Sequence, residues 1–476
     1  MILLDKLHNR IFRVIGFGLI MLAACAPAAP AAPAAPVEVE VEVEVTRIVE
    51  VAGKPVVKVV VAPPIPTVPE VAIRYYSLHA IDHTHIVIPL KRGWNKDVGI
   101  SILPEPFGSS VGADKIVSGL TSGSVDIASG STVFALAGYD KNDGYRDFGH
   151  GDIFQGFGFM VDPKAGYKSV EDFISEGKQP KDAIKATAEQ FRGKKLSTLN
   201  EGGILGFINI ALESAGMSID DIEVQKFDTD SKIIAEMISG RADFAVGSAP
   251  GRISMTLEGF VPVLTSLHIS KFAEASPDSK ELRAVFHDGW ATTPQYWESN
   301  RETVFRFMSM IYRTLRAMVD TPEETIPDHV DFYNSIAGAT LTAEDAKIIY
   351  DELDPFVKYE DQGPWYEDEF RKSNPLHYCN VTGSHIKLWE ENEVLKPGAW
   401  SCENASFSLE LWSEFKAREA NSAQLINKAE GLVSDNTPQA KELLDKAKFF
   451  TEIYDFLDAE RFAEAAIEWA EFEKGL

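Results

Sequence analysis

The chain has 476 residues, enough for more than one domain, and carries 46 Lys and Arg against 72 Asp and Glu. Its formal net charge of −26 leaves no basic surplus to neutralise phosphates, which argues against a nucleic-acid-binding protein. The same charge argues against electrostatic docking on an anionic membrane surface.

The first 25 residues have the features of a lipoprotein signal peptide. Lys6, Arg10 and Arg13 precede an apolar run over residues 14–22 that is too short to span a bilayer. The run ends in Leu-Ala-Ala-Cys25, which resembles a bacterial lipobox. We therefore expect Cys25 to be the lipidated first residue of a mature protein anchored to the outer side of the cell membrane. An ordinary signal peptide with an incidental cysteine is the alternative.

Residues 26–70 have the composition of a stalk. Ala/Pro repeats are followed by a strict Val–Glu alternation over residues 37–45. Alternation is typical of a β-strand, but glutamate at every second position, with no turn or partner strand nearby, favours an extended and solvated chain. The sequence therefore predicts a disordered tether over residues 26–70.

From residue 71 the sequence alternates between strand and helix patterns. The predicted elements are strands at residues 71–76, 98–103 and 125–128 and helices at residues 86–93, despite Pro89, and 112–120. Such alternation predicts βαβ units and a largely parallel sheet.

A glycine-containing run at residues 154–161 marks a predicted crossing into a second lobe. That lobe is expected to contain strands at residues 195–199 and 222–227 with a helix at 204–214 between them. Residues 261–264 are expected to return the chain to the first lobe.

Residues 114–131 and 231–248 are two copies of one pattern at a fixed offset. Each copy reads as a helix, a glycine stop, a buried strand and a Gly-Ser loop at the strand's carboxyl end, where open α/β sheets place ligands. Asp126 and Asp243 open the two strands. A catalytic role is conceivable, but beside a glycine turn the chemistry of Asp favours backbone capping.

The remaining chain is predicted to be largely helical. Capping-box patterns begin helices at Ser299 and Thr342. Residues 403–476 are rich in Ala, Glu, Lys and Leu and predict a helical appendage, a hairpin or helix–turn–helix over residues 416–433 and 438–474. Cys379 and Cys402 form an even pair in an exported protein, which predicts a disulfide; two free thiols are the alternative.

Several segments together resemble a known family. They are Trp94-Asn-Lys-Asp-Val-Gly-Ile-Ser-Ile, the first repeat copy, Phe191-Arg-Gly-Lys-Lys-Leu, Ala211-Leu-Glu-Ser-Ala-Gly-Met and Asp220-Asp-Ile-Glu-Val. Their order and spacing over about residues 71–320 resemble the solute-binding proteins of ABC importers for sulfonates, taurine, nitrate and thiamine precursors, the NMT1/THI5-like group.

The resemblance implies a two-lobed α/β fold of the periplasmic-binding-protein type II, extended at the C-terminus by helices. Lobe 1 would comprise residues 71–160 and 263–400, and lobe 2 residues 161–262. The two lobes would close on a small molecule and deliver it to an ABC permease in the membrane.

The ligand-binding residues implied by the resemblance come from five places. They are Ser77, His79 and His83 after the first strand; Gly130, Ser131 and Thr132; Glu201, Gly202 and Gly203; Ser248; and Trp290. Hydroxyls and free amides at helix starts suit an anion such as a sulfonate or nitrate. Glu201 would repel such an anion, which makes a neutral or cationic heterocycle resembling a thiamine precursor an equal candidate, unless Glu201 points to solvent.

His79, Asp82, His83 and His85 are the densest set of metal-capable residues, but no second cluster accompanies them, so we expect a polar binding loop without a metal. No cofactor is expected. No nucleophile-elbow, P-loop or zinc-protease motif occurs, so the sequence predicts a binding protein and not an enzyme. The alternatives are a sensory or scaffold lipoprotein acting through its C-terminal helices and, less favoured, an iron-dependent pyrimidine synthase, whose Cys-rich motif is missing here.

Overall fold

The computed structural model describes residues 44–51, 54–141, 144–200 and 202–475. The predictions for the signal peptide, for Cys25, for residues 26–43 and for Glu201 lie outside these residues. Within the described part, no helix combines the length and hydrophobicity needed to cross a bilayer.

The first described elements form a β-hairpin. Strand β1 (Glu44–Val51) pairs antiparallel with β2 (Lys54–Val61), from Glu44 opposite Val61 to Val51 opposite Lys54. The sequence interpretation placed an unpaired stalk here, but the partner strand lies immediately downstream. The valines of β2 belong to the β-branched residues that favour strands, so the pairing has a local cause that the Val–Glu repeat alone did not reveal.

Lobe 1 is built on a mixed sheet with the strand order β4-β3-β6-β13-β7, and β5 also pairs with β3. Its strands are β3 (Val71–Leu78), β4 (Ile100–Leu103), β5 (Ser109–Val111), β6 (Ile127–Gly130), β7 (Arg146–Phe154) and β13 (Phe286–Thr292). Strand β3 is parallel to β4 and β6, whereas β13 is antiparallel to both of its neighbours.

Lobe 2 repeats this plan with the order β10-β9-β11-β8-β12. Its strands are β8 (Gly158–Val161), β9 (Lys195–Leu199), β10 (Glu223–Phe227), β11 (Phe244–Val246) and β12 (Val261–Thr265). Here β8 is the strand antiparallel to both neighbours. The two sheets have the same strand order when the parallel-type strands of each lobe, leaving out β5, are numbered 1 to 4 along the chain. If n denotes the antiparallel strand, which is β13 in lobe 1 and β8 in lobe 2, the order in both sheets is 2-1-3-n-4. The predicted two-lobed type II α/β fold is confirmed.

One predicted crossing point is wrong. Residues 261–264 do not return the chain to lobe 1, because β12 pairs with β8 and places Val261 opposite Val161. The return is made by β13 instead. A short apolar run fits the edge of either sheet, so its sequence does not reveal its partner.

Helices flank both sheets. In chain order they are η1 (Ile81–Ile86), α2 (Val87–Arg92), α3 (Trp94–Asp97), α4 (Ala113–Thr121), α5 (Thr132–Ala135), α6 (Val170–Ser175), α7 (Pro180–Glu189), α8 (Gly202–Glu213), α9 (Asp230–Ile238), α10 (Ala249–Leu257), α11 (Ser266–Ser270), α12 (Pro294–Ser299), α13 (Arg301–Asp320), α14 (Pro322–Ala337), α15 (Ala343–Ile348), α16 (Gly363–Tyr366), α17 (Tyr378–Glu391) and α18 (Cys402–Ala405). Helix α13 packs on β4 and β7 of lobe 1. The capping box predicted at Ser299 is wrong, because Ser299 ends α12 and α13 begins after Asn300, whereas the one predicted at Thr342 is confirmed.

The sequence repeat recurs as a repeated set of hydrogen bonds. Asp126 accepts a bond from the backbone N–H of Arg74 at 2.9 Å, and its own N–H donates to the Arg74 carbonyl. Asp243 does the same with Lys195, accepting at 2.8 Å and donating at 2.9 Å. Each aspartate thus joins the third strand of its lobe to the backbone of the first strand, as the capping interpretation predicts.

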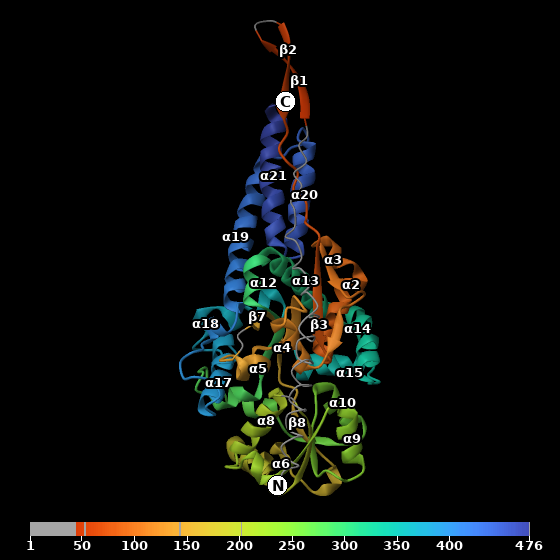
Figure 1. Cartoon of the computed structure of the whole chain (residues 1–476), viewed down its shortest axis with the longest axis vertical. Helices are drawn as coiled ribbons and strands as arrows, with labels where there is room; N and C mark the ends of the chain where they lie inside the picture. Colours follow the sequence, from red (N-terminus) through yellow and green to blue (C-terminus); the bar gives the residue numbers. More distant parts are fainter. Residues whose placement is uncertain (1–43, 52–53, 142–143, 201, 476) are drawn as a thin grey trace, which may run out of the picture. The chain divides into compact units, whose positions relative to one another are not determined.

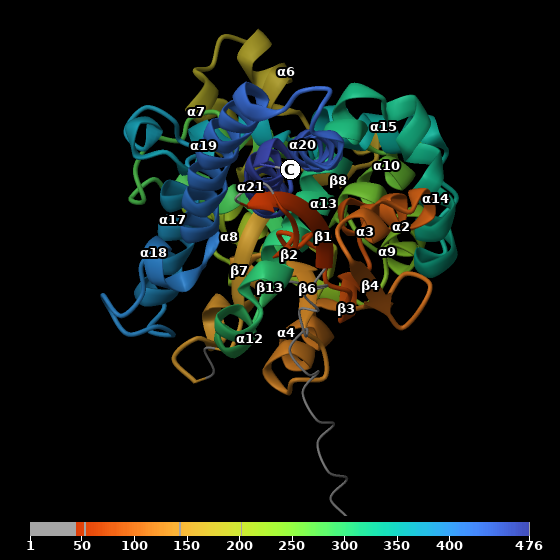
Figure 2. The same cartoon turned by 90° about the horizontal axis from the view of Figure 1, so that it is seen from above.

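The C-terminal appendage consists of three helices, α19 (Ser408–Leu432), α20 (Pro438–Glu452) and α21 (Phe456–Gly475), which lie side by side in both Figure 1 and Figure 2. The sequence predicted one helix over residues 438–474. The structure breaks it where Tyr454 adopts a positive φ of 64° and Asp455 N–H donates back to Phe450.

The appendage shares its hydrophobic core with lobe 1. The rings of Phe415 in α19 and Phe305 in α13 stack with centroids 3.8 Å apart. Arg306 of α13 donates two hydrogen bonds, of 2.8 and 3.0 Å, to the buried carboxylate of Asp458 in α21. The apolar stripes of α19 and α21 are therefore used in packing.

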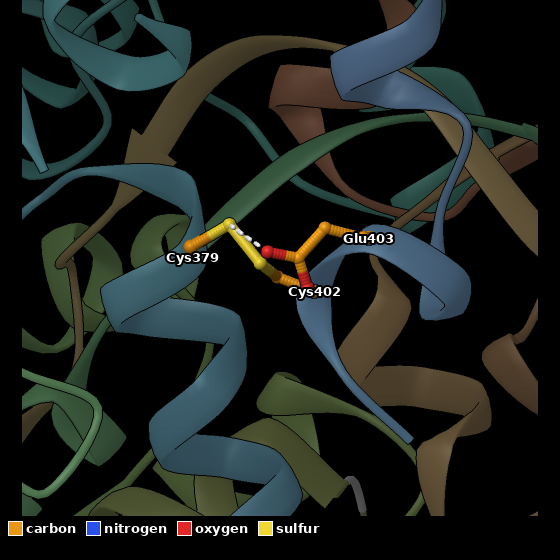
Figure 3. A group of neighbouring side chains, drawn as sticks. All are labelled: Cys379, Cys402 and Glu403. Atoms are coloured by element: carbon orange, nitrogen blue, oxygen red, sulfur yellow. Dashed lines mark hydrogen bonds between the residues drawn. A yellow bond between two sulfur atoms is a disulfide. The ribbon is translucent and has the colours of Figure 1, made fainter. Parts of the chain in front are cut away.

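A disulfide joins Cys379 in α17 to Cys402 in α18, and Figure 3 shows Glu403 beside it. The Cys379 Sγ lies 4.0 Å from the Glu403 carboxylate. Because both sulfurs are in the disulfide, neither offers a thiolate for reaction or for a metal.

Candidate ligand-binding cavity

A cavity of about 1070 Å³ lies between the two lobes and is lined by both. Lobe 1 contributes residues from the segment after β3 and from β13, and lobe 2 contributes the ends of β9, β10 and β11 with the helices that follow them. These are the carboxyl ends of parallel strands in lobe 2, where α/β sheets place ligands. The volume is at the upper end of the range for small-molecule sites.

The lobe 1 wall presents three buried side chains that meet at one point. Asp82 and His83 lie on η1, and Asp288 lies on β13. His83 Nε2 is 3.0 Å from Asp82 Oδ2 and 3.6 Å from Asp288 Oδ1. All three residues are at most 4% exposed, yet all line the cavity.

Two further carboxylates lie behind this wall. Asp152 and Asp354 are buried and electrostatically coupled to Asp82. Burial raises the pKa of Asp82 to about 7, and burial together with the neighbouring carboxylates raises those of Asp152 and Asp354 well above their usual values. Burial also lowers the pKa of His83 to about 3, so this imidazole does not supply a positive charge at neutral pH. The wall is therefore rich in carboxyl groups that bind protons more readily than an exposed aspartate does.

In lobe 2 the start of α10 is already occupied by a side chain of the protein. Ser248, the N-cap, donates from its N–H and its hydroxyl to Asp230, at 3.0 and 2.5 Å. The Ser248 hydroxyl accepts in turn from Gly251 N–H at 3.1 Å. Desolvation raises the pKa of Asp230 despite these bonds. The carboxylate stands where an external anion would meet the helix.

Lobe 1 has the same arrangement at the equivalent loop. Both the N–H and the hydroxyl of Thr132, at the start of α5, donate to Asp147. Burial alone would raise the pKa of Asp147, but His150 and the hydroxyls of Ser406 and Thr132 hold it below its usual value. Both copies of the repeat thus direct their helix starts toward an internal aspartate.

Aromatic rings form the apolar part of the cavity. Phe154, Phe157 and Phe286 pack together, with Phe154 stacked on Phe286 at 5.2 Å and tilted against Phe157 at 4.4 Å. Phe134 and Tyr333 line other parts of the wall. These rings offer flat surfaces for an aromatic ligand.

Aspartates outnumber lysines in the lining of the cavity. Lys226 and Lys232 line it together with Asp228 and Asp230, and Lys232 pairs with Asp228 at 2.6 Å. A ligand therefore meets four aspartates, counting Asp82 and Asp288, against two lysines.

With this geometry established, the chain can be compared with known proteins. Residues 178–325 match the family model described as NMT1/THI5 like. The chain carries an NMT1/THI5-like segment. The matched residues include the lobe 2 wall of the cavity and β13. The match confirms the family resemblance predicted from the sequence. A comparison with curated proteins finds no match.

Solved structures with a similar arrangement include binding proteins and one enzyme. The periplasmic aliphatic sulphonate binding protein SsuA from Escherichia coli is 12% identical, with 70% of this chain and 91% of that one covered and a TM-score of 0.49. The periplasmic nitrate-binding protein NrtA from Synechocystis PCC 6803 is 10% identical, with 72% and 88% covered and a TM-score of 0.49. The desulfurization enzyme DSZB is 11% identical, with 73% and 99% covered and a TM-score of 0.46.

Of the site residues implied by the NMT1/THI5-like resemblance, His79, His83 and Ser248 line the cavity. Six others are absent from the lining: Ser77, Gly130, Ser131, Thr132, Gly203 and Trp290. Ser131 donates to the His287 carbonyl at 2.6 Å, and Trp290 is 1% exposed within the lobe 1 core. Gly203 lies against the ring of Phe286, where a Cβ would approach to 2.9 Å.

Sequence reasoning missed Asp288, Asp230 and the phenylalanine group. Asp288 is two residues from Trp290, and simple strand alternation would place both on one face. The register shifts after Asp288 and after Trp290 leave the extra residue on β7, so the sequence of β13 itself does not show that Asp288 reaches the cavity while Trp290 lies in the core. Asp230 lies one residue before the second repeat copy, and Ala113 occupies the corresponding position before the first copy, so the repeat gave no signal for it.

Proposed function

We propose that this protein is an extracytoplasmic solute-binding protein that captures a small molecule between its lobes and delivers it to the permease of an ABC importer. The observation that carries this proposal is the cavity itself, which takes its walls from both lobes at the switch point of two matching sheets. Attachment to the membrane through lipid on Cys25 is part of the same proposal.

The occupied helix starts favour a neutral or cationic ligand over a sulfonate or nitrate. Asp147 and Asp230 already accept the hydrogen bonds that the two repeat loops would offer to an anion. An anion entering the cavity would also face Asp82 and Asp288. We therefore propose a nitrogen heterocycle or another organic cation, seated against Phe154 and Phe286.

The test is a thermal-shift and calorimetric screen of the mature full-length protein. It compares cationic and neutral heterocycles related to thiamine with sulfonates and nitrate. A ligand at 100 times its dissociation constant stabilises the folded state by about 2.7 kcal/mol. We expect a shift with a heterocycle and none with the anions.

Matched aromatic variants locate the binding. Phe154→Leu removes a ring from the cavity and should weaken binding at least about fivefold, because base–aromatic stacking contributes about 1–3 kcal/mol. Phe173→Leu changes a ring of α6 outside the cavity lining and should leave affinity unchanged. No shift with any compound class, or equal affinity in both variants, would overturn the proposal.

The scaffold alternative receives less support from the packing of the C-terminal helices. Phe415 and Asp458 already contact lobe 1, so no protein partner is needed to explain the apolar stripes of these helices. The enzyme alternative is tested in the same screen. Any compound that binds is incubated with the protein and followed for turnover, which we expect to be absent.

A further inference from the structure

We propose that Asp82, His83 and Asp288 form a binding site for a divalent transition-metal cation in the lobe 1 wall of the cavity. This metal site is separate from the proposed capture of a solute, because its three ligand residues are the same whichever organic molecule the cavity binds. Each offers one ligand atom, and these atoms all lie within 4.8 Å of one another.

The distances suit a small tetrahedral cation. Ligand atoms about 2.1 Å from a tetrahedral Zn²⁺ lie roughly 3.4 Å apart. The separations from His83 Nε2, 3.0 Å to Asp82 and 3.6 Å to Asp288, bracket that value. One imidazole and two carboxylates are also a ligand set that Zn²⁺ accepts.

An unsatisfied imidazole nitrogen supplies the second observation. His83 is 2% exposed, and its Nε2 has no hydrogen-bond partner among the described residues, although two carboxylate oxygens lie near it. A buried polar atom without a partner is costly. A cation between the nitrogen and the oxygens would give His83 Nε2 the partner that it lacks.

The surrounding charge favours a cation of charge two. Asp152 and Asp354 add two more buried carboxylates behind the three ligands. In the described part of the chain, Asp82, Asp152 and Asp354 form no ion pair with a lysine or arginine. A buried carboxylate that is ionised needs a positive partner, and a divalent ion would offset two of them.

The site is accessible from the cavity. Asp82, His83 and Asp288 all line it, so a cation can enter without unfolding. Three protein ligands leave one tetrahedral position for water or for a donor atom of the captured molecule.

The proposal is tested on the full-length mature protein after removal of metals with a chelator. Zn²⁺ titration by calorimetry, with elemental analysis of the dialysed complex, should give one bound ion per chain. Co²⁺ should give the intense visible absorption of a four-coordinate site. Mg²⁺ and Ca²⁺, which prefer more oxygen ligands, should bind at least tenfold more weakly.

Near-isosteric variants test the assignment. His83→Gln and Asp288→Asn should each weaken Zn²⁺ binding at least tenfold and abolish the Co²⁺ absorption. His268→Gln, which alters a histidine in lobe 2 paired with Glu171, should do neither. Circular dichroism confirms that each variant is folded; if one is not, Asp82→Asn replaces it.

Two results would overturn the site: a metal-free wild type that binds no Zn²⁺, or binding that survives both His83→Gln and Asp288→Asn. If the metal-free wild type binds no Zn²⁺ but still binds an organic ligand, the metal-site proposal fails and the solute-binding proposal stands.

Discussion

Single aspartates in this protein serve three separate structural purposes. Asp126 and Asp243 hold strands together through backbone N–H groups. Asp147 and Asp230 occupy helix starts. Asp288 belongs to the cavity wall. The residue type alone does not distinguish these purposes; the hydrogen-bond partner does.

The Asp243 cap allows a direct stability measurement. Asp243→Ala leaves the Lys195 N–H without its side-chain acceptor, so we expect the free energy of unfolding to fall by about 1–2 kcal/mol in urea titrations. Asp243→Asn keeps an acceptor oxygen and should lose less. The control is Asp228→Ala, which removes an exposed helical ion pair to Lys232. Equal losses in Asp243→Ala and Asp228→Ala would contradict the capping role.

His385 should make stability depend on pH. Its Nε2 lies 2.9 Å from the Val285 carbonyl, and burial, reinforced by Arg283, lowers its pKa to about 4. The unfolded chain takes up this proton below about pH 6.5, whereas the folded chain does so only near pH 4. Stability from this residue is therefore present above pH 6.5 and is lost as the pH falls toward 4.

The variant His385→Gln isolates that contribution. Between pH 7 and pH 5 the wild type should lose on the order of 2 kcal/mol more than the variant, because the two differ only in this titration. Urea unfolding at both pH values gives the four free energies required. Identical pH dependence in the two proteins would show that His385 titrates normally in the folded state.

At the residue scale, sequence patterns predicted the roles that arise locally. The turn chemistry of Asp126 and Asp243 was sufficient to predict their capping role, because each side chain accepts a hydrogen bond from the backbone of an adjacent strand. His83 was selected from the sequence, but its neighbour Asp288 is 205 positions further along the chain. Contacts between such distant residues depend on how β13 crosses into lobe 1, which no local pattern encodes.

At the scale of elements, the strands and helices of the two lobes were predicted close to their observed bounds. The failures have identifiable causes. The break at Tyr454 contains neither Gly nor Pro, and a tyrosine rarely adopts positive φ. Contacts outside the helix stabilise it there: the Tyr454 hydroxyl donates to Glu360 at 2.5 Å, and Arg316 lies over its ring at 4.7 Å.

The disulfide between α17 and α18 should contribute to stability by constraining the unfolded chain. Its cysteines are 23 positions apart, for which the loop-entropy model gives roughly 3 kcal/mol. We expect the double variant Cys379→Ser/Cys402→Ser to unfold at a correspondingly lower urea concentration than the oxidised wild type. Reduction of the wild type should have the same effect. A double variant as stable as the oxidised protein would show that the loop is already ordered in the unfolded state.

At the scale of the whole molecule, the family resemblance and the internal repeat were enough to predict two α/β lobes. They were not enough to place the C-terminal helices, because amphipathic helices pack on any apolar surface of suitable size. The structure shows which surface is used: α19 contacts β7 and α16, and α21 contacts α13.

Removal of residues 408–476 should therefore destabilise lobe 1. The deletion exposes Phe305, leaves Arg306 without Asp458, and uncovers Tyr366, which stacks on Trp412. We expect an insoluble or loosely packed protein with reduced near-UV circular dichroism. A truncated chain with an unchanged melting temperature and intact ligand binding would show that the helices are an independent module.

The attachment of the three helices to lobe 1 also makes them an internal frame of reference. If capture involves rotation of lobe 2, then α19, α20 and α21 remain fixed with respect to half of the cavity. A spin label on the exposed Lys428 of α19 and a second on the exposed Lys185 of α7 would then measure the swing of one lobe against the other. The helices would act as a lever that converts a small angular change at the ligand into a larger change in distance between the two labels.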